Sequence, residues 1–146
     1  MSECTFCQTK LSKGDLQSYR VGDIVRQVKT EISEGCSEVW LTSTDNGCYG
    51  FDINSDLPEL INSVVEIPDK FFVRVGMMNP MYMPRIRDNL LKSFDSSKVF
   101  KFLHVPVQSG SDKVLNDMKR GHTASTFRDV VNQFREKFGK FTISTD

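Results

Sequence analysis

Two cysteines near the start of the chain, Cys4 and Cys7, have a side chain and a spacing that suit metal or redox chemistry. A short turn brings the two sulfurs of a C-x2-C pair to the same side, so both thiolates can bind one metal ion or one edge of an iron-sulfur cluster. Thioredoxin-like redox pairs and zinc sites use the same spacing. The pair alone leaves three kinds of site open, and the rest of the chain has to decide among them.

The composition indicates one globular domain without a strong attraction to polyanions. Of the 146 residues, 38% are hydrophobic, which is enough for a core. The 19 basic and 19 acidic side chains give a formal net charge of zero, so any RNA contact has to be local or come from another domain. No apolar run reaches the roughly 20 residues of a membrane span, and no signal-peptide core is present. We expect a cytoplasmic protein without membrane contact, whose cysteines are reduced or metal-bound.

Helical and strand-like segments alternate along the chain. Helices are expected at 21–34, from Asp56 to Val65, from Pro84 to Phe94, around Val114 to Met118 and from Thr123 to Phe138, with Asp56 and Thr123 as N-caps. Strands are expected at Val39–Leu41, Phe71–Val75, Val99–Val105 and Phe141–Thr145. Roughly thirty to forty residues separate successive strands, which is the size of a βαβ unit with parallel strands and a right-handed crossover. The predicted fold class is α/β.

Polar loops follow the expected strands, whereas the loops after the helices are short. In barrels and open α/β sheets, ligands bind at the carboxyl ends of the strands, so we expect the binding face at these loops. A complete barrel needs more strands than the four expected here. We therefore expect a single domain over residues 1–146 that is a parallel-stranded, partial TIM-type barrel truncated at both ends.

Four stretches of the chain can be read together: Cys4 through Tyr19, Leu41–Gly50, Arg74–Pro80, and His104 through Arg120. In this order they resemble the radical S-adenosylmethionine (radical SAM) domain of the methylthiotransferases, over essentially the whole chain. The likeness is nearest to the archaeal and eukaryotic branch that acts on tRNA. It implies an enzyme that adds a methylthio group to the adenine C2 of threonylcarbamoyladenosine, with tRNA as its partner and an electron donor that the sequence does not identify.

The resemblance also implies a 4Fe-4S cluster at the cysteines. The family motif is C-x3-C-x2-C, in which Cys4 and Cys7 match the second and third ligands within a cluster-binding turn at residues 1–19. The first ligand would fall directly before Met1. In the family, the open iron of the cluster binds S-adenosylmethionine, and an electron from the cluster releases methionine and a 5′-deoxyadenosyl radical.

Further domains are implied by the same likeness. A second 4Fe-4S cluster would lie on an N-terminal sulfur-donor domain, and a C-terminal domain would bind RNA; neither is expected within these 146 residues. We therefore expect the chain alone to be inactive and unable to hold a stable cluster.

In the family, the loops after the strands surround S-adenosylmethionine. Small hydroxyl and amide side chains can hydrogen-bond a ribose or an amino acid zwitterion, and Gly110 lets the backbone come close. Arg120 matches a basic position that meets the carboxylate or the substrate, although it could equally be a cation at a helix C-terminus. The candidate cofactor contacts are Ser43, Thr44, Asp45, Asn46, Asn79, Gln108, Ser109, Gly110, Ser111 and Arg120. No catalytic side chain is predicted.

The remaining cysteines and methionines are expected to be structural. Cys36 and Cys48 are interpreted as small packing residues, and His122 as a solvated side chain. The methionines around Pro80 could form an apolar wall for adenine, but packing is the favoured interpretation for most of them; they are Met77, Met78, Met81 and Met83.

Three alternatives stay open. The enzyme could be the related methylthiotransferase that modifies an aspartate of a ribosomal protein. The chain could instead be a non-enzymatic binding module in which zinc bound to Cys4 and Cys7 fixes the N-terminus. Open sheet edges could also pair two copies into an oligomer. Metal analysis, titration with S-adenosylmethionine and light scattering distinguish these possibilities.

Overall fold

The computed structural model describes residues 4–146, so the first three residues of the expected cluster-binding turn lie outside the described residues. The elements, in chain order, are α1 (Thr9–Lys13), α2 (Val21–Ser33), β1 (Glu38–Leu41), η1 (Asn46–Cys48), α3 (Leu57–Val65), β2 (Phe72–Val75), η2 (Pro80–Tyr82), α4 (Met83–Ser93), β3 (Phe102–His104), α5 (Asp112–Asp117), α6 (Ala124–Phe138) and β4 (Thr142–Ser144). Among the described helices, none combines the length and the apolar character that crossing a bilayer requires.

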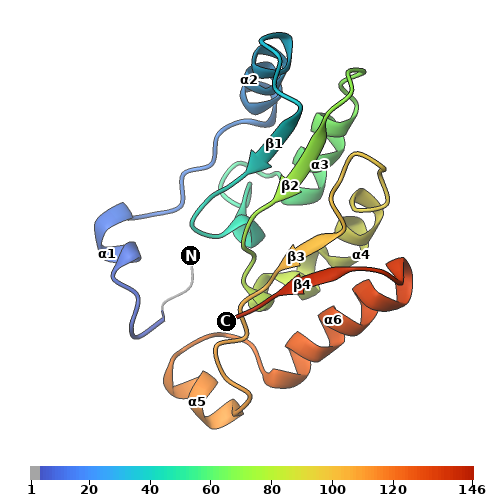
Figure 1. Ribbon diagram of the computed structural model, residues 1–146. Coiled ribbons are helices and arrows are strands. Elements are labelled where there is room, and N and C mark those ends of the chain that lie inside the picture. Colours follow the sequence, from blue (N-terminus) through green and yellow to red (C-terminus); the bar gives the residue numbers. More distant parts are fainter. Residues whose placement is uncertain (1–3) are drawn as a thin grey trace.

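The strands of the described residues all run parallel. β1 pairs with β2, and β3 pairs with β4. The residues just before β3 join the two pairs, because the Val73 N–H donates to the Lys98 carbonyl (2.8 Å) and the Phe100 N–H donates to the Val73 carbonyl (3.0 Å). The strands therefore lie side by side in the order β1, β2, β3, β4 (Figure 1), which confirms the α/β class with parallel strands.

One face of the sheet carries the hydrophobic core. Side chains alternate along a strand, so Val73 of β2 is buried while its neighbours Phe72 and Arg74 lie on the opposite face. The core joins the buried face to α3, α4 and α6; its largest members include Leu57, Ile61, Leu90, Phe94, Leu103 and Phe134. On the other face, the Arg74 guanidinium lies 4.5 Å from the ring centroid of Trp40 and 4.6 Å from that of Phe102. Trp40 is 57% exposed there.

Local sequence signals set the helix ends. Asp56 accepts a hydrogen bond from a backbone N–H in the first turn of α3 (2.9 Å), and Thr123 does the same for α6 (3.1 Å), as the sequence predicts. Gly35 after α2 and Gly139 after α6 both have a positive φ, at 101° and 63°. A residue with a Cβ resists that conformation, so these two glycines end their helices without strain.

The third strand is shorter than expected. The run from Val99 bridges to Val73 of β2 first, and the chain then bends so that Phe102–His104 pairs with β4. One apolar run is therefore divided between two neighbours. The sequence also did not predict α1 or the two short 3-10 helices, which have too few residues for a periodic pattern.

Candidate functional site

The loops at the carboxyl ends of β1 and β2 are fastened to each other. One carboxylate oxygen of Asp45 accepts the N–H groups of Gly47 (2.9 Å) and Asn79 (3.1 Å), so a single side chain joins the two loops. The Asn46 N–H donates to the Met77 carbonyl at 2.9 Å and adds a second connection. Backbone groups that are fixed in this way make the strand ends a preformed rim.

The cysteine turn lies against this rim. The Cys7 N–H donates to the Cys4 carbonyl (3.2 Å), which closes the turn that the spacing predicts. The next contact is distant in sequence, since the Thr5 N–H donates to the Met118 carbonyl (3.1 Å) at the end of α5. The N-terminal stretch is therefore held at the same end of the sheet as the polar loops.

Cys4 and Cys7 line one small cavity together with the strand-end loops. Its volume is about 120 Å³. Cys4 is buried, whereas Cys7 is exposed. The predicted cofactor contacts that line it are Thr44, Asp45, Asn79, Gln108 and Arg120. With Thr9, the cavity thus gathers two thiols, two amides, two hydroxyls, a carboxyl and a guanidinium from segments that lie far apart in the chain.

The other predicted contacts lie elsewhere. Ser43 and Asn46 line a larger cavity beside β1. Ser109, Gly110 and Ser111 lie farther along the loop after β3, and of these described residues none lines either cavity. Ser111 instead caps α5 by accepting a backbone N–H at 3.5 Å.

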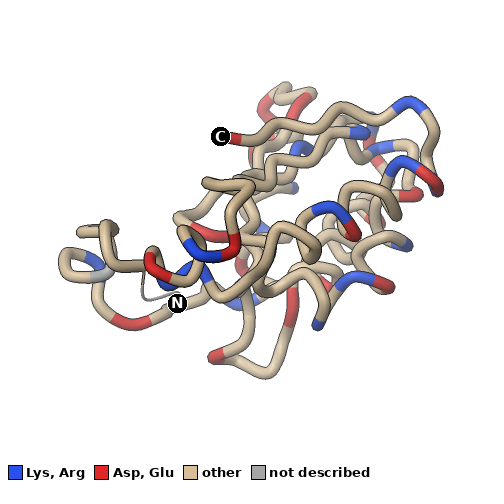
Figure 2. Tube along the Cα trace, turned by 90° about the horizontal axis from the view of Figure 1, so that it is seen from below, with Lys and Arg blue, Asp and Glu red and all other residues tan. Residues whose placement is uncertain are grey.

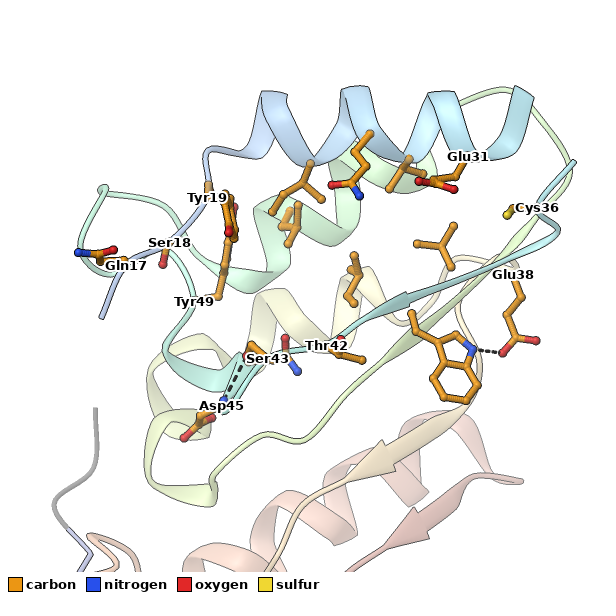
Figure 3. A pocket seen from close by; sticks show the side chains of 18 of the residues that line it. Gln17, Ser18, Tyr19, Glu31, Cys36, Glu38, Thr42, Ser43, Asp45 and Tyr49 are labelled. Carbon is orange, nitrogen blue, oxygen red and sulfur yellow. Dashed lines mark hydrogen bonds between the residues drawn. The ribbon is translucent and has the colours of Figure 1, made fainter. Parts of the chain in front are cut away.

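The larger cavity has a volume of about 560 Å³ and runs between α2 and β1 (Figure 3). At one end, the Tyr49 hydroxyl donates to the Tyr19 carbonyl at 2.8 Å. At the other end lie Cys36 and Glu38, the latter accepting a hydrogen bond from the Trp40 indole. The interpretation of Cys36 as a packing residue is wrong, because the turn between α2 and β1 leaves it exposed.

Burial governs the electrostatics around Asp45. Desolvation raises the pKa of its carboxyl group, while the Asn79 and Gly47 N–H groups and the Arg120 charge act in the opposite direction. Cys48 belongs to η1, which begins directly after Asp45, and burial and then the Asp45 charge raise its pKa to about 11. Its thiol donates to the Asp45 carbonyl at 3.3 Å. The interpretation of Cys48 as a packing residue is confirmed by its 2% exposure.

His122 is buried, so its interpretation as a solvated side chain is wrong. It is 8% exposed, with Nε2 3.3 Å from the Val107 carbonyl and Nδ1 3.4 Å from the Arg120 carbonyl. Burial lowers its pKa. The turn between α5 and α6 folds beneath the loop after β3 instead of projecting into solvent. The imidazole therefore holds the segment of Arg120 against the loop that carries Gln108.

The sequence did not identify the whole lining of the small cavity. The further lining residues are Phe6, Thr9, Met77 and Pro106. Met77 is half-buried and lines the cavity, whereas Met78 and Met83 are fully buried in the core, as the packing interpretation holds for most of the methionines. The sequence analysis named Met77 among the methionines that could form an apolar wall, and its position in the loop directly after β2 explains why it lines the cavity.

Comparison with known protein families identifies this arrangement. The family model described as the Radical SAM superfamily matches residues 2–145. The chain belongs to the radical SAM superfamily. This superfamily implies a partial TIM-like barrel, which agrees with the parallel strands and the outer helices described above.

Curated relatives match over the whole chain. A probable threonylcarbamoyladenosine tRNA methylthiotransferase of Pyrococcus abyssi is 42% identical over 146 residues, covering 100% of this chain and 34% of the relative. A protein of the same name from Archaeoglobus fulgidus is 45% identical over 147 residues, with 100% and 35% covered. The threonylcarbamoyladenosine tRNA methylthiotransferase of Mus musculus is 44% identical over 147 residues, with 100% and 25% covered. The chain thus spans about a third or less of the length of these relatives.

Radical SAM membership implies a 4Fe-4S cluster and S-adenosylmethionine, and the small cavity fits part of this requirement. Two thiols line it, and thiolates are the ligands that iron-sulfur clusters use. Within residues 4–146, no group of three or more His, Cys, Asp or Glu side chains converges, so the two cysteines of this cavity are candidates for only part of a cluster's ligand set. The Nε atom of Arg120 is buried and has no hydrogen-bond partner among the described residues, which suits a cavity that receives an anionic group.

Proposed function

We propose that this chain is the cofactor-binding core of a tRNA methylthiotransferase that adds a methylthio group to the adenine C2 of threonylcarbamoyladenosine. One observation carries the proposal. Cys4, Cys7 and the strand-end side chains meet at a single cavity, in a chain that is 42% to 47% identical over its full length to proteins named for that activity.

Within this proposal, the residues of the cavity divide the work. Cys4 and Cys7 hold the 4Fe-4S cluster, and Thr44, Asn79 and Gln108 orient S-adenosylmethionine beside it. The bound, reduced cluster supplies the electron for cleavage of the sulfonium bond. The protein contributes a rim whose loops are already fastened together, so the bound groups meet fixed hydrogen-bond donors and acceptors.

The other predicted contacts belong to the proposal as well. Ser43 and Asn46 line the larger cavity beside β1, and Ser109, Gly110 and Ser111 lie farther along the loop after β3. Their backbone and side-chain groups come into reach of S-adenosylmethionine if it extends from the cavity along these loops. Arg120 lines the cavity on the side of Cys4, where the cluster and S-adenosylmethionine would meet.

We propose that the barrel continues beyond these residues in the full-length protein. Among the described residues, β1 and β4 each have one edge without a strand partner. Further strands would cover both edges, the first cluster ligand would lie directly before Met1, and a sulfur-donor domain with a second 4Fe-4S cluster and an RNA-binding domain would flank this core. Without them, the 146-residue chain would be inactive, and its open edges could pair two copies.

Contact with tRNA would come mainly from the other domains. Lys and Arg residues are interleaved with Asp and Glu along the trace (Figure 2), and the formal net charge is zero. Affinity for nucleic acid depends largely on cations that neutralise phosphates, so this core alone gives little of it. We place the protein in the cytoplasm, where it would meet tRNA and an electron donor.

Mass spectrometry of tRNA nucleosides tests the proposed function. A strain without the gene should lack the methylthio form of threonylcarbamoyladenosine. The wild-type gene should restore it, whereas a Cys4→Ala, Cys7→Ala double variant should not. Unchanged tRNA together with loss of methylthio-aspartate from a ribosomal protein would instead identify the related enzyme. No change in either, with stoichiometric zinc in the purified protein, would identify a binding module.

A further inference from the structure

Arg120 has an environment that is unusual for an arginine. It follows α5, between Lys119 and Gly121, whose φ angles are both positive at 53° and 71°. Gly121 packs against Met81, whose terminal methyl group would lie 2.8 Å from a Cβ at position 121 and would have to shift. This tight turn holds the guanidinium inside the protein, and Arg120 is 7% exposed.

The guanidinium contacts a cysteine of the small cavity. Its Nη1 atom donates to the Cys4 sulfur at 3.3 Å, although the two residues are 116 positions apart. Its Nε atom is buried without a hydrogen-bond partner among the described residues, and Arg120 lines the same cavity as both cysteines. Leaving a buried N–H group of a cation unsatisfied is costly, so an acceptor that reaches the guanidinium from the cavity would stabilise it.

The position of Arg120 is held from its other side. Its backbone N–H donates to the Leu115 carbonyl at 3.0 Å, and its carbonyl lies 3.4 Å from the buried His122 ring. Among the described residues, no carboxylate lies within ion-pair distance of the guanidinium. Of the described carboxylates, Asp45 is close enough for the Arg120 charge to oppose the rise of its pKa on burial but forms no ion pair with it, so the guanidinium remains available to a bound anion.

We propose that Arg120 is a positioning residue for the cluster: it donates hydrogen bonds to the Cys4 thiolate and to the cluster sulfur, and thereby stabilises the reduced cluster. The inference depends on the proposed function, because it needs a cluster at Cys4 and Cys7. Reduction adds a negative charge, so a buried cation and a hydrogen bond to sulfur stabilise the reduced form more than the oxidised form. Arg120 then raises the reduction potential of the cluster and slows the loss of the cluster from the protein.

The test compares three substitutions in the full chain, including whatever residues the gene encodes on either side of these 146. Arg120→Met removes all donors and keeps an unbranched side chain. Arg120→Lys keeps the charge but loses the planar fork. Lys119→Asn is the matched control, because it removes one cation at the adjacent, exposed position with a residue that tolerates a positive φ.

Three readouts are taken after anaerobic reconstitution: the midpoint potential from an EPR-monitored redox titration, the rate of iron loss to a chelator, and the dissociation constant of S-adenosylmethionine. Arg120→Met should lower the potential and raise the rate of iron loss by roughly 10- to 100-fold, the usual cost of removing a supporting partner of a metal ligand. The potential and the rate of iron loss of Arg120→Lys should lie between those of Arg120→Met and those of the wild type. Lys119→Asn should match the wild type in all three.

The opposite pattern overturns the inference. If Arg120→Met weakens binding of S-adenosylmethionine while the potential and the iron loss stay at the wild-type values, the guanidinium serves the ligand carboxylate and not the cluster. If Arg120→Met does not fold, the same readouts on Arg120→Lys decide. A wild-type protein that takes up no cluster at all contradicts the proposed function itself, which is a separate result.

Discussion

The cavity beside β1 and the cavity at the strand ends contrast in size and in composition, and the smaller of the two gathers more reactive and charged groups. The cavity beside β1 has about 560 Å³, yet apolar side chains of α2 and β1 form much of its wall, and its one cysteine, Cys36, lies at its end (Figure 3). The cavity at the strand ends has about 120 Å³ and brings together Cys4, Cys7 and Arg120. The volume of a cavity is therefore a weaker indication of a functional site than the reactive and charged side chains that converge on it.

The difference has a structural cause. The large cavity lies beside the edge of β1 that has no strand partner within the described residues, so it is the space left where the sheet ends. The small cavity is enclosed by loops that the fold holds in place, with Asp45 as the connection between two of them. The following experiments compare matched residues of the two cavities.

The largest expected effect is on cluster content. Cys4→Ala and Cys7→Ala should each abolish stable cluster binding in the full chain, because each removes a thiolate ligand. Cys36→Ala should leave iron and sulfide content at the wild-type level, since Cys36 lies at the end of the other cavity. Iron and sulfide analysis after anaerobic reconstitution checks this. If Cys36→Ala lost as much iron as Cys4→Ala and Cys7→Ala, the cluster could not be assigned to the small cavity.

Asp45 should be the next most sensitive position. In Asp45→Ala the N–H groups of Gly47 and Asn79 lose their shared acceptor, at a cost of about 1 to 3 kcal/mol each. Denaturant unfolding of the protein without S-adenosylmethionine measures the loss. An unchanged unfolding free energy would show that the rim is not held together by this carboxylate.

The pH dependence of Asp45 gives a second reading of the same residue. Asp45→Asn keeps an oxygen for both N–H groups but cannot ionise. Burial raises the folded pKa of Asp45 above its ordinary value of 3.8, so the folded state binds that proton more tightly than the unfolded state. The stability that this provides is complete below pH 3.8 and is lost as the pH rises through the folded pKa.

The unfolding free energy of the wild type relative to Asp45→Asn should therefore fall as the pH rises from the acid side of 3.8 towards neutrality. Denaturant curves of both proteins across this pH range measure the difference. A difference that stays constant, or that increases with pH, would contradict a buried carboxyl with a raised pKa.

A smaller effect is expected for ligand affinity. Gln108 lines the small cavity with a φ of 70°, so Gln108→Gly removes the amide without adding backbone strain. Loss of one hydrogen bond should weaken binding of S-adenosylmethionine about tenfold, which corresponds to about 1.4 kcal/mol. Gln27→Ala, on the wall of the large cavity, is the control and should leave affinity unchanged in a calorimetric titration. A larger loss of affinity in Gln27→Ala than in Gln108→Gly would indicate that S-adenosylmethionine binds in the large cavity.

The smallest effect is expected at Trp40, which is 57% exposed beside the large cavity. Trp40→Ala removes its contact with the Arg74 guanidinium, and such exposed contacts contribute about 0.5 to 1 kcal/mol. Thermal unfolding should show a correspondingly small shift, with no change in cluster content. A loss of several kcal/mol would show that further parts of the protein pack on this side chain.

The sequence predicted features that depend on neighbours in the chain. Asp56 and Thr123 cap the helices that follow them, because a cap is decided within one helical turn. Thr44 and Gln108 were selected for the cavity, since loops after parallel strands meet at one edge of a sheet. The contact between Arg120 and Cys4 was not predictable in this way.

Features that depend on tertiary packing were missed. His122 was expected in solvent, but its burial depends on how the turn between α5 and α6 folds under the loop after β3. Cys36 was expected to pack, but the turn before β1 leaves it exposed. Both residues lie in short connections, where composition does not reveal which way the chain turns.

The most direct test of the account is the EPR spectrum of the reduced, reconstituted full chain, recorded with and without S-adenosylmethionine. If Cys4 and Cys7 hold a 4Fe-4S cluster beside the cofactor loops, the spectrum should show a reduced cluster signal that changes when S-adenosylmethionine is added. The signal should be absent in the Cys4→Ala, Cys7→Ala variant. A wild-type protein with no such signal, or with a signal that S-adenosylmethionine leaves unaltered, would contradict the assignment of the small cavity.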